Sequence, residues 1–178
     1  MRRRMLGMAV AGVLVVSLAS AVHAQSRYSW VGVAATVPVG DSKDAMKTGW
    51  MGDVGMGFPL MGSKKTSLQL GGLYGSNDAK VGSGSSTFYA VYLNVGYTVN
   101  PDAKISPYGY LGGGILGSKP EGGSSDTNGA YQVGAGLAYT VNPKCQFWGE
   151  ARYLGSGSGN SKLTLMPITI GLTYIYTK

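Results

Sequence analysis

The strongest constraint in this sequence is a pair of alternating segments joined by a tight turn. In residues 131–141 the odd positions carry tyrosine, valine, alanine or leucine, and the even positions carry small or polar residues. Alternation with a period of two is typical of a β-strand with one apolar face. Asn142 and Pro143 then give a turn signal, and residues 145–155 supply the returning strand. The pattern predicts a β-hairpin over residues 130–155.

The first half of this hairpin repeats an earlier segment. Tyr89 and Tyr97 recur 42 positions later as Tyr131 and Tyr139, each pair followed by an Asn-Pro turn. Successive hairpins of equal length produce such repeats. Eight residues span about 26 Å of strand, or about 20 Å after a tilt of roughly 40°, the height of the lipid-facing band of a membrane barrel with aromatic residues at both edges. An amphipathic strand in a soluble β-sandwich would show the same pattern.

The first 24 residues have the three parts of a secretory signal peptide. Arginines occupy positions 2–4, an apolar segment covers residues 6–20, and small residues precede a cleavage site after Ala24. We predict that residues 1–24 are removed and that residues 25–178 form one exported β-barrel domain. Loss of the three arginines lowers the formal net charge from +7 to +4. A smaller basic excess and export both argue against a nucleic-acid partner.

The exported part is rich in glycine and in aromatic residues. It holds 28 of the 30 glycines, all twelve tyrosines and all three tryptophans, whereas His23, the only histidine, lies in the leader. A soluble domain of this size normally needs a richer aliphatic interior. A barrel in lipid needs apolar residues only on its outer face and fills a narrow lumen with small and polar ones. The composition therefore favours a membrane barrel.

Eight segments have the length and alternation of strands, and no segment has an apolar period of 3.6 residues over a helical length. The strands are predicted at residues 28–39, 48–60, 66–77, 87–99, 105–117, 130–141, 145–155 and 163–177. The faces of residues 105–117 remain unassigned. Connections after odd-numbered strands are long and glycine-rich, the longest at residues 118–129, and those after even-numbered strands are tight. Outer-membrane barrels show this parity, so the predicted fold is an all-β, eight-stranded antiparallel up-and-down transmembrane β-barrel.

The sequence resembles the small outer-membrane β-barrel family of the OmpA transmembrane domain, OmpX and opacity proteins. The resemblance rests on residues 107–114 (PYGYLGGG), residues 131–153 and residues 168–174 (ITIGLTY). It implies a location in the cell outer membrane, in contact with lipid and lipopolysaccharide. It also implies that the outer-membrane assembly machinery recognises the C-terminal strand, with Tyr176 as its closing aromatic residue.

The inward and outward phases of the strands predict two sets of functional residues. The inward set forms a polar core in the lumen, made of Asp53, Gln69, Gln132, Glu150 and Arg152. Buried charges require partners, so Arg152 is expected to pair with one or both carboxylates. The outward set forms the aromatic girdles, made of Tyr89, Tyr97, Tyr131, Tyr139, Tyr174 and Tyr176. Tyr131 is expected at the outer girdle and Tyr139 at the periplasmic one.

No segment predicts a catalytic, cofactor or metal site. The G-x-G-x-x-G match at residues 112–117 lacks the following helix that nucleotide binding requires. Residues 126–129 lack the further ligands of a calcium loop and are interpreted as a turn. Cys145 is the only cysteine and is interpreted as a packing residue. The resemblance implies that enzymes among such barrels use a histidine, which residues 25–178 lack, so we predict no enzyme.

These observations predict a structural or surface-interaction role for a barrel with a packed lumen. It would stabilise the envelope or present its loops to an extracellular ligand. One alternative is a narrow channel or binding protein for small hydrophobic solutes, which Trp30, Phe88 and Tyr92 on the inward phase disfavour. A second alternative is a secreted soluble β-sandwich, which requires another sheet to cover the apolar face.

Overall fold

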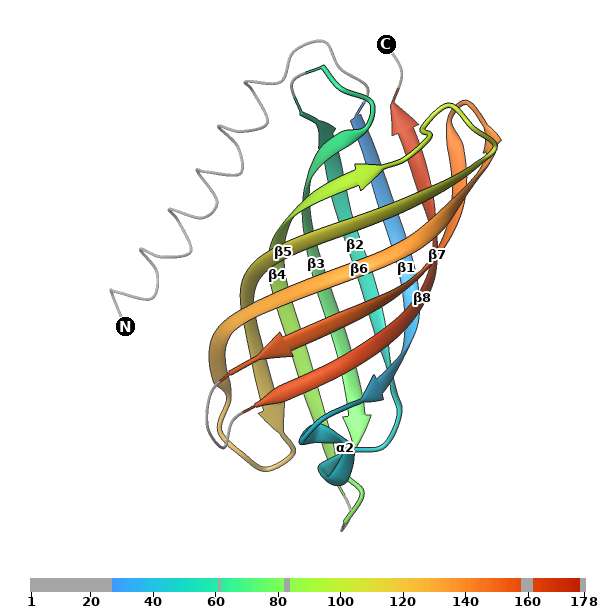
Figure 1. Cartoon of the computed structure of the whole chain (residues 1–178). Coiled ribbons are helices and arrows are strands. Elements are labelled where there is room, and N and C mark those ends of the chain that lie inside the picture. Colours follow the sequence, from blue (N-terminus) through green and yellow to red (C-terminus); the bar gives the residue numbers. More distant parts are fainter. Residues whose placement is uncertain (1–26, 61, 82–83, 158–161, 177–178) are drawn as a thin grey trace.

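The computed structural model describes residues 27–60, 62–81, 84–157 and 162–176, and the predicted signal peptide lies outside these residues. Eight strands form one closed barrel in sequence order, as Figure 1 shows. They are β1 (Arg27–Pro38), β2 (Gly49–Pro59), β3 (Thr66–Asp78), β4 (Ser85–Thr98), β5 (Ile105–Pro120), β6 (Asp126–Asn142), β7 (Cys145–Ser156) and β8 (Leu163–Tyr176). The short helix α2 (Ser42–Ala45) lies between β1 and β2.

Every strand is antiparallel to both of its neighbours, and β1 pairs with β8 to close the sheet. The predicted eight-stranded antiparallel barrel is confirmed. The β-sandwich alternative is wrong, because a closed barrel has no second sheet to cover its outward face. We call the end at which β1 begins and β8 ends the terminal end, and the opposite end, where α2 lies, the loop end (Figure 1).

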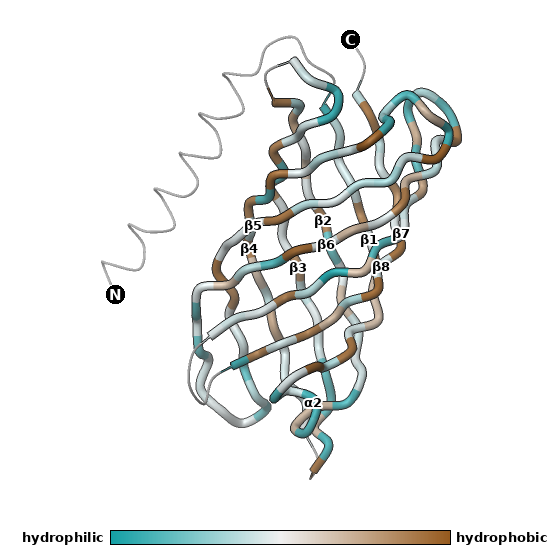
Figure 2. Tube along the Cα trace, in the orientation of Figure 1, coloured by the Kyte–Doolittle hydropathy of each residue, from teal (hydrophilic) through white to brown (hydrophobic). Residues whose placement is uncertain are grey.

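The alternation of the sequence becomes two faces of the barrel wall. Apolar side chains such as Leu93, Leu137 and Ile170 point outward and are exposed, with 56% of Leu137 accessible. Figure 2 shows hydrophobic residues alternating with others along the strands. Since an isolated soluble barrel would not expose so much apolar surface, the outward face is a surface for lipid.

The glycine-rich connection between β5 and β6 is shorter than predicted. The segment at residues 118–129 is mostly strand, because β5 continues to Pro120 and β6 begins at Asp126, leaving five residues between them. The turn interpretation of residues 126–129 is therefore wrong. Backbone hydrogen bonds between neighbouring strands need no apolar side chains, so polar, glycine-rich sequence continues the ladder beyond the apolar band.

The connection between β1 and β2, which we call the tied connection, is hydrogen-bonded to neighbouring segments at the loop end. The Thr164 amide donates to the Ser42 hydroxyl at 2.9 Å, and the Lys80 amide donates to the Ala45 carbonyl at 2.9 Å. Met46 forms an isolated antiparallel bridge with Ala79. These bonds join the connection to β8 and to the β3–β4 connection. Within the described residues, no helix is long and apolar enough to cross a membrane.

Candidate functional site

The inward-facing side chains form three layers along the barrel axis. The layer nearest the loop end is an apolar cluster that includes Met51, Leu73, Phe88, Leu116 and Leu165, each at most 5% exposed. Met46, from the tied connection, packs against it. We call this group the apolar plug. These side chains are packed against one another, so the loop half of the lumen is more apolar than predicted. Polar residues are buried there as well, since the Thr36 hydroxyl donates to Asn77 Oδ1 at 3.0 Å and both residues are at most 1% exposed.

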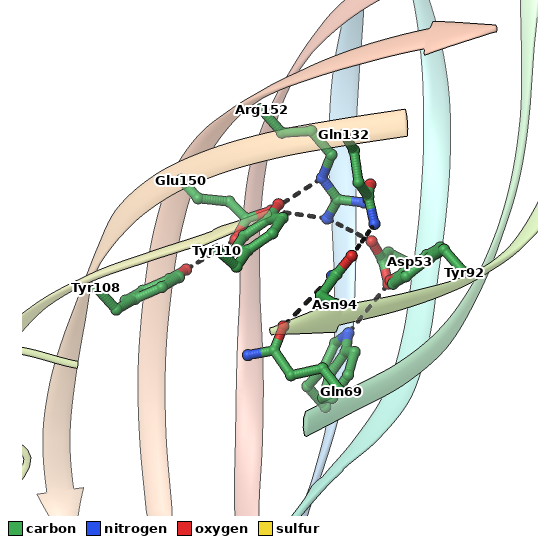
Figure 3. A network of polar contacts seen from close by, with 10 residues as sticks. Asp53, Gln69, Tyr92, Asn94, Tyr108, Tyr110, Gln132, Glu150 and Arg152 are labelled. Carbon is green, nitrogen blue, oxygen red and sulfur yellow. Dashed lines mark hydrogen bonds and ion pairs between the residues drawn. The ribbon is translucent and has the colours of Figure 1, made fainter. Parts of the chain in front are cut away.

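The middle layer is a charged cluster around Arg152 (Figure 3). Its Nη2 lies 2.5 Å from Asp53 Oδ2 and 2.7 Å from Glu150 Oε1, and its Nε donates to the same Glu150 oxygen at 3.1 Å. The Asp53 contact is an ion pair without hydrogen-bond geometry at Oδ2. All three residues are at least 92% buried. The structure thus brings β2 and β7 together through one guanidinium and two carboxylates.

Neutral donors also contact both carboxylates. Trp30 Nε1 and the Tyr92 hydroxyl donate to Asp53 Oδ1 at 3.0 and 2.5 Å. The Tyr110 hydroxyl donates to Glu150 Oε1 at 2.7 Å, and the Tyr108 hydroxyl donates to Oε2 at 2.9 Å. The rings of Tyr92 and Tyr110 each lie 5.7 Å from the guanidinium carbon of Arg152. Hydrogen bonds of this kind help to hold buried charge in one arrangement.

The predicted amides extend this cluster toward the terminal end. Arg152 Nη1 donates to Gln132 Oε1 at 3.3 Å, and Gln132 Nε2 donates to Asn94 Oδ1 at 2.8 Å. Asn94 Nδ2 reaches Gln69 Oε1 at 3.4 Å, and Gln69 Nε2 donates to the Tyr28 hydroxyl at 3.2 Å. The five residues predicted for the polar core therefore belong to one network across β2, β3, β4, β6 and β7, in which Asp53 is joined by its ion pair with Arg152 and the others by hydrogen bonds.

The third layer is a cavity of about 540 Å³ between this network and the terminal end. We call it the inner cavity. Polar residues and aromatic rings line it, among them Tyr28, Trp30, Tyr108, Tyr110 and Trp148, with Glu150 and Arg152 at its floor. Lys64 and Asp102 line its mouth and pair at 2.8 Å. The prediction of a packed lumen thus fits the loop half and the middle layer. The terminal half instead contains the inner cavity.

Glycines make room for the aromatic rings of the interior. Gly32 and Gly171 are opposite each other on β1 and β8, and the Trp148 indole lies over both. A Cβ at Gly32 would stand 2.7 Å from that indole, and one at Gly171 would collide with both the indole and the Val31 carbonyl. The flat ring therefore replaces the missing side chains in packing against the sheet.

The tyrosines predicted for the girdles all point outward and are exposed. Tyr97, Tyr139, Tyr174 and Tyr176 lie near the terminal end, and Tyr89 and Tyr131 lie toward the loop end. Tyr131 stands against Tyr153, with ring centroids 6.1 Å apart, and Trp50 stands against Tyr74 at 5.9 Å. Trp50, Tyr74 and Tyr153 are additional members of the outer group.

The described residues contain no group of three or more metal-ligating side chains. The G-x-G-x-x-G segment lies inside β5, where a Cβ at Gly112 or Gly114 would collide with β4, so these glycines serve strand packing. Cys145 is a half-buried free thiol at the start of β7.

Residues 10–175 match the family described as outer membrane protein beta-barrel domain. The chain belongs to this family. As a member of the outer-membrane β-barrel family, the protein resides in the cell outer membrane. No curated protein matches the sequence significantly.

Solved structures show the same fold at low sequence identity. The neisserial surface protein A covers 86% of this chain over 100% of its own length, with a TM-score of 0.69 and 15% identity. OprG of Pseudomonas aeruginosa covers 87% over 97%, with a TM-score of 0.62 and 14% identity. The attachment invasion locus protein Ail of Yersinia pestis covers 85% over 98%, with a TM-score of 0.57 and 15% identity. These likenesses establish the barrel.

Sequence reasoning missed Tyr108, Tyr110 and Trp148 as lumen residues. The tyrosines lie in residues 105–117, whose phase is obscured by the run of three glycines at 112–114. The pairing of β5 with β6 shows which residues of β5 face inward, because Tyr110 lies opposite Gly134 and Tyr108 lies opposite Gly136, and both glycines are on the inward phase of β6. Trp148 shares the phase of Glu150 and Arg152, and this signal was present in the sequence.

Proposed function

We propose that this protein is a structural and surface-interacting component of the outer membrane, with a lumen closed to solutes and no catalytic activity. The proposed orientation in the membrane places the terminal end in the periplasm and the loop end on the outside of the cell. One observation carries the proposal: the apolar plug fills the loop half of the lumen, and the tied connection packs onto it through Met46. A path for solutes would have to displace both.

The absence of catalysis is proposed from chemistry. Residues 25–178 contain no histidine, so a hydroxyl nucleophile would lack its usual base. The carboxylates Asp53 and Glu150 each accept hydrogen bonds from two neutral donors and contact Arg152. Carboxylates held in this way stabilise the middle layer and are poorly placed to exchange protons with a substrate.

The outward face of the loops is electrically balanced. The loop-end connections and adjoining strand ends carry five lysines and five acidic residues, namely Lys43, Lys47, Lys80, Lys119, Lys162, Asp41, Asp44, Asp78, Glu121 and Asp126. Ail has been solved in complex with the heparin analogue sucrose octasulfate. Because this chain has no basic excess there, we propose that an extracellular ligand would be bound through hydrogen bonds and apolar contacts.

Three further partners follow from the exposed wall. Lipid is expected to cover the apolar band, and lipopolysaccharide to surround its outer edge near Tyr89 and Tyr131. The assembly machinery is expected to engage β8, whose outward Ile170, Tyr174 and Tyr176 are exposed.

The runner-up function is a channel or binding protein for small hydrophobic solutes. The inner cavity favours binding, whereas the apolar plug opposes passage. Conductance of the purified barrel in planar bilayers separates the two. We expect no conductance from the wild type, and conductance from a variant carrying Met51→Ala, Phe88→Ala and Leu165→Ala.

A matched control removes side chains of similar kind from the outside of the wall, with Leu93→Ala, Leu137→Ala and Ile170→Ala. This variant should show no conductance, since its lumen is unchanged. Steady conductance or solute uptake by the wild-type barrel would contradict the closed lumen. The surface role is tested separately, by detergent sensitivity of cells lacking the protein and by adhesion of cells whose residues 121–125 are replaced.

A further inference from the structure

The charges around the inner cavity do not cancel. Its floor contains one guanidinium, from Arg152, against the carboxylates of Asp53 and Glu150. Asp53 lies behind the surface of the cavity, and Glu150 lies on it. At the mouth, Lys64 and Asp102 neutralise each other at 2.8 Å. With both floor carboxylates ionised, the charged side chains that line or support the cavity leave one negative charge uncompensated, and Glu150 is the carboxylate of the pair that lines the cavity.

Glu150 also retains capacity to accept a hydrogen bond. Its Oε1 accepts from the Tyr110 hydroxyl and from two nitrogens of Arg152, whereas its Oε2 accepts from the Tyr108 hydroxyl alone among the described residues. A carboxylate oxygen accommodates about two donors. Tyr108 and Glu150 both line the cavity, so a donor entering from the terminal end can approach the carboxylate that has this remaining acceptor capacity.

The walls suit a cation with an apolar body. The rings of Tyr28, Trp30, Tyr108 and Trp148 line the cavity, and tyrosine and tryptophan faces attract cations. The volume of about 540 Å³ is within the range of small-molecule sites. Arg152 offers little to an anion, because it already contacts two carboxylates and the rings of Tyr92 and Tyr110.

We propose that the inner cavity is a binding site, open toward the terminal end, for a small organic ammonium compound. Its primary ammonium group donates to Glu150 Oε2 and lies among the aromatic walls, while its apolar part extends toward Ala138 and Ile175. The apolar plug prevents this ligand from leaving through the loop end. The site therefore serves solutes of the periplasm, independently of any ligand of the outer loops.

Titration calorimetry of the refolded barrel in an uncharged maltoside detergent tests the site. The compounds are 2-phenylethylamine, which is an ammonium ion at neutral pH, the neutral 2-phenylethanol and the anionic 3-phenylpropionate, each corrected for uptake by empty micelles. We expect the ammonium compound to bind at least about tenfold more tightly than either of the others. Equal binding of the three compounds, or no binding of the amine, would overturn the proposal.

Two variants locate the site. Glu150→Gln removes the uncompensated charge and should weaken amine binding about tenfold or more, whereas the same change at Glu121, near the loop end, should leave it unchanged. Ala138→Trp fills the cavity without touching any charge and should abolish binding. If Glu150→Gln does not fold, Ala138→Trp and the ratio among the three compounds decide. Unchanged amine binding by Ala138→Trp would show that the cavity is not the site.

Discussion

Replacing Arg152 with methionine removes the only cation from a buried cluster that keeps two carboxylates. The change deletes the ion pairs to Asp53 and Glu150 at 2.5 and 2.7 Å and the hydrogen bond to Gln132 at 3.3 Å. Removing one member of a buried ion pair typically costs 3–5 kcal/mol. With a urea dependence of about 2 kcal/mol per molar, the unfolding midpoint should fall by roughly 1.5–2.5 M. Urea unfolding in lipid vesicles, followed by tryptophan fluorescence, measures the shift.

Two control variants separate charge from packing. Asp53→Asn and Glu150→Gln, added to Arg152→Met, remove the whole charge set, and the triple variant should recover most of the lost free energy of unfolding. Lys64→Met breaks an exposed pair with Asp102 and should cost at most about 1 kcal/mol. A loss below about 1 kcal/mol for Arg152→Met, or a triple variant no more stable than the single one, would refute the reasoning.

Three further predictions use the same unfolding assay. Leu137→Arg places a charge on the lipid face and should cost about 2–4 kcal/mol of unfolding free energy if its site is near the bilayer midplane. Its neighbour Gly136 faces the lumen against β7, so Gly136→Arg should fail to form a barrel, as shown by the absence of a heat-modifiable band on gels. Gly171→Val should cost about 1–3 kcal/mol through crowding of the Trp148 indole, with a shift in tryptophan emission; unchanged emission and stability would contradict the packing of that ring. Phe88→Ala should cost about 3–5 kcal/mol, because the side chain is 1% exposed in the apolar plug, and a loss near zero would mean that the plug is loosely packed.

The strand number and the two faces could be predicted because they depend on local alternation. One inward and one outward phase per strand follow from the period of two, so Leu137 and Glu150 fall on opposite faces without knowledge of their partners. The hairpin over residues 130–155 appears as β6 and β7, with Pro143 and Lys144 between them. The structure places this turn at the terminal end, together with the other connections that follow even-numbered strands (Figure 1).

The extent of the strands could not be predicted from the same signal. Ser118 and Asp126 are opposite each other in the β5–β6 ladder, although the segment between residues 118 and 129 has the composition of a loop. Apolar alternation is imposed by lipid, and it stops where the lipid stops. Hydrogen bonds of the closed sheet continue further, and composition does not report them.

The sequence contains a weak signal for the layers inside the lumen. Met51, Leu116 and Leu154 occupy inward positions toward the loop end, and Asp53 and Arg152 lie one inward position nearer the terminal end than Met51 and Leu154. Comparing inward residues at the same level across the strands would have shown an apolar layer nearer the loop end and a polar layer nearer the terminal end. The cavity could not be found in this way, because its volume depends on how far each side chain reaches across the lumen.

The order of the layers explains how a narrow barrel carries a charged cluster next to an apolar one. A polar seal across the whole lumen would need a partner for every buried group, and each missing partner would cost free energy. Apolar side chains need none, so the apolar plug closes the loop half, with Phe88 and Leu165 almost fully buried. The charged cluster lies at the boundary between this plug and the inner cavity, where Glu150 and Arg152 line a space open toward the terminal end. Contact with that space reduces the desolvation cost of the cluster.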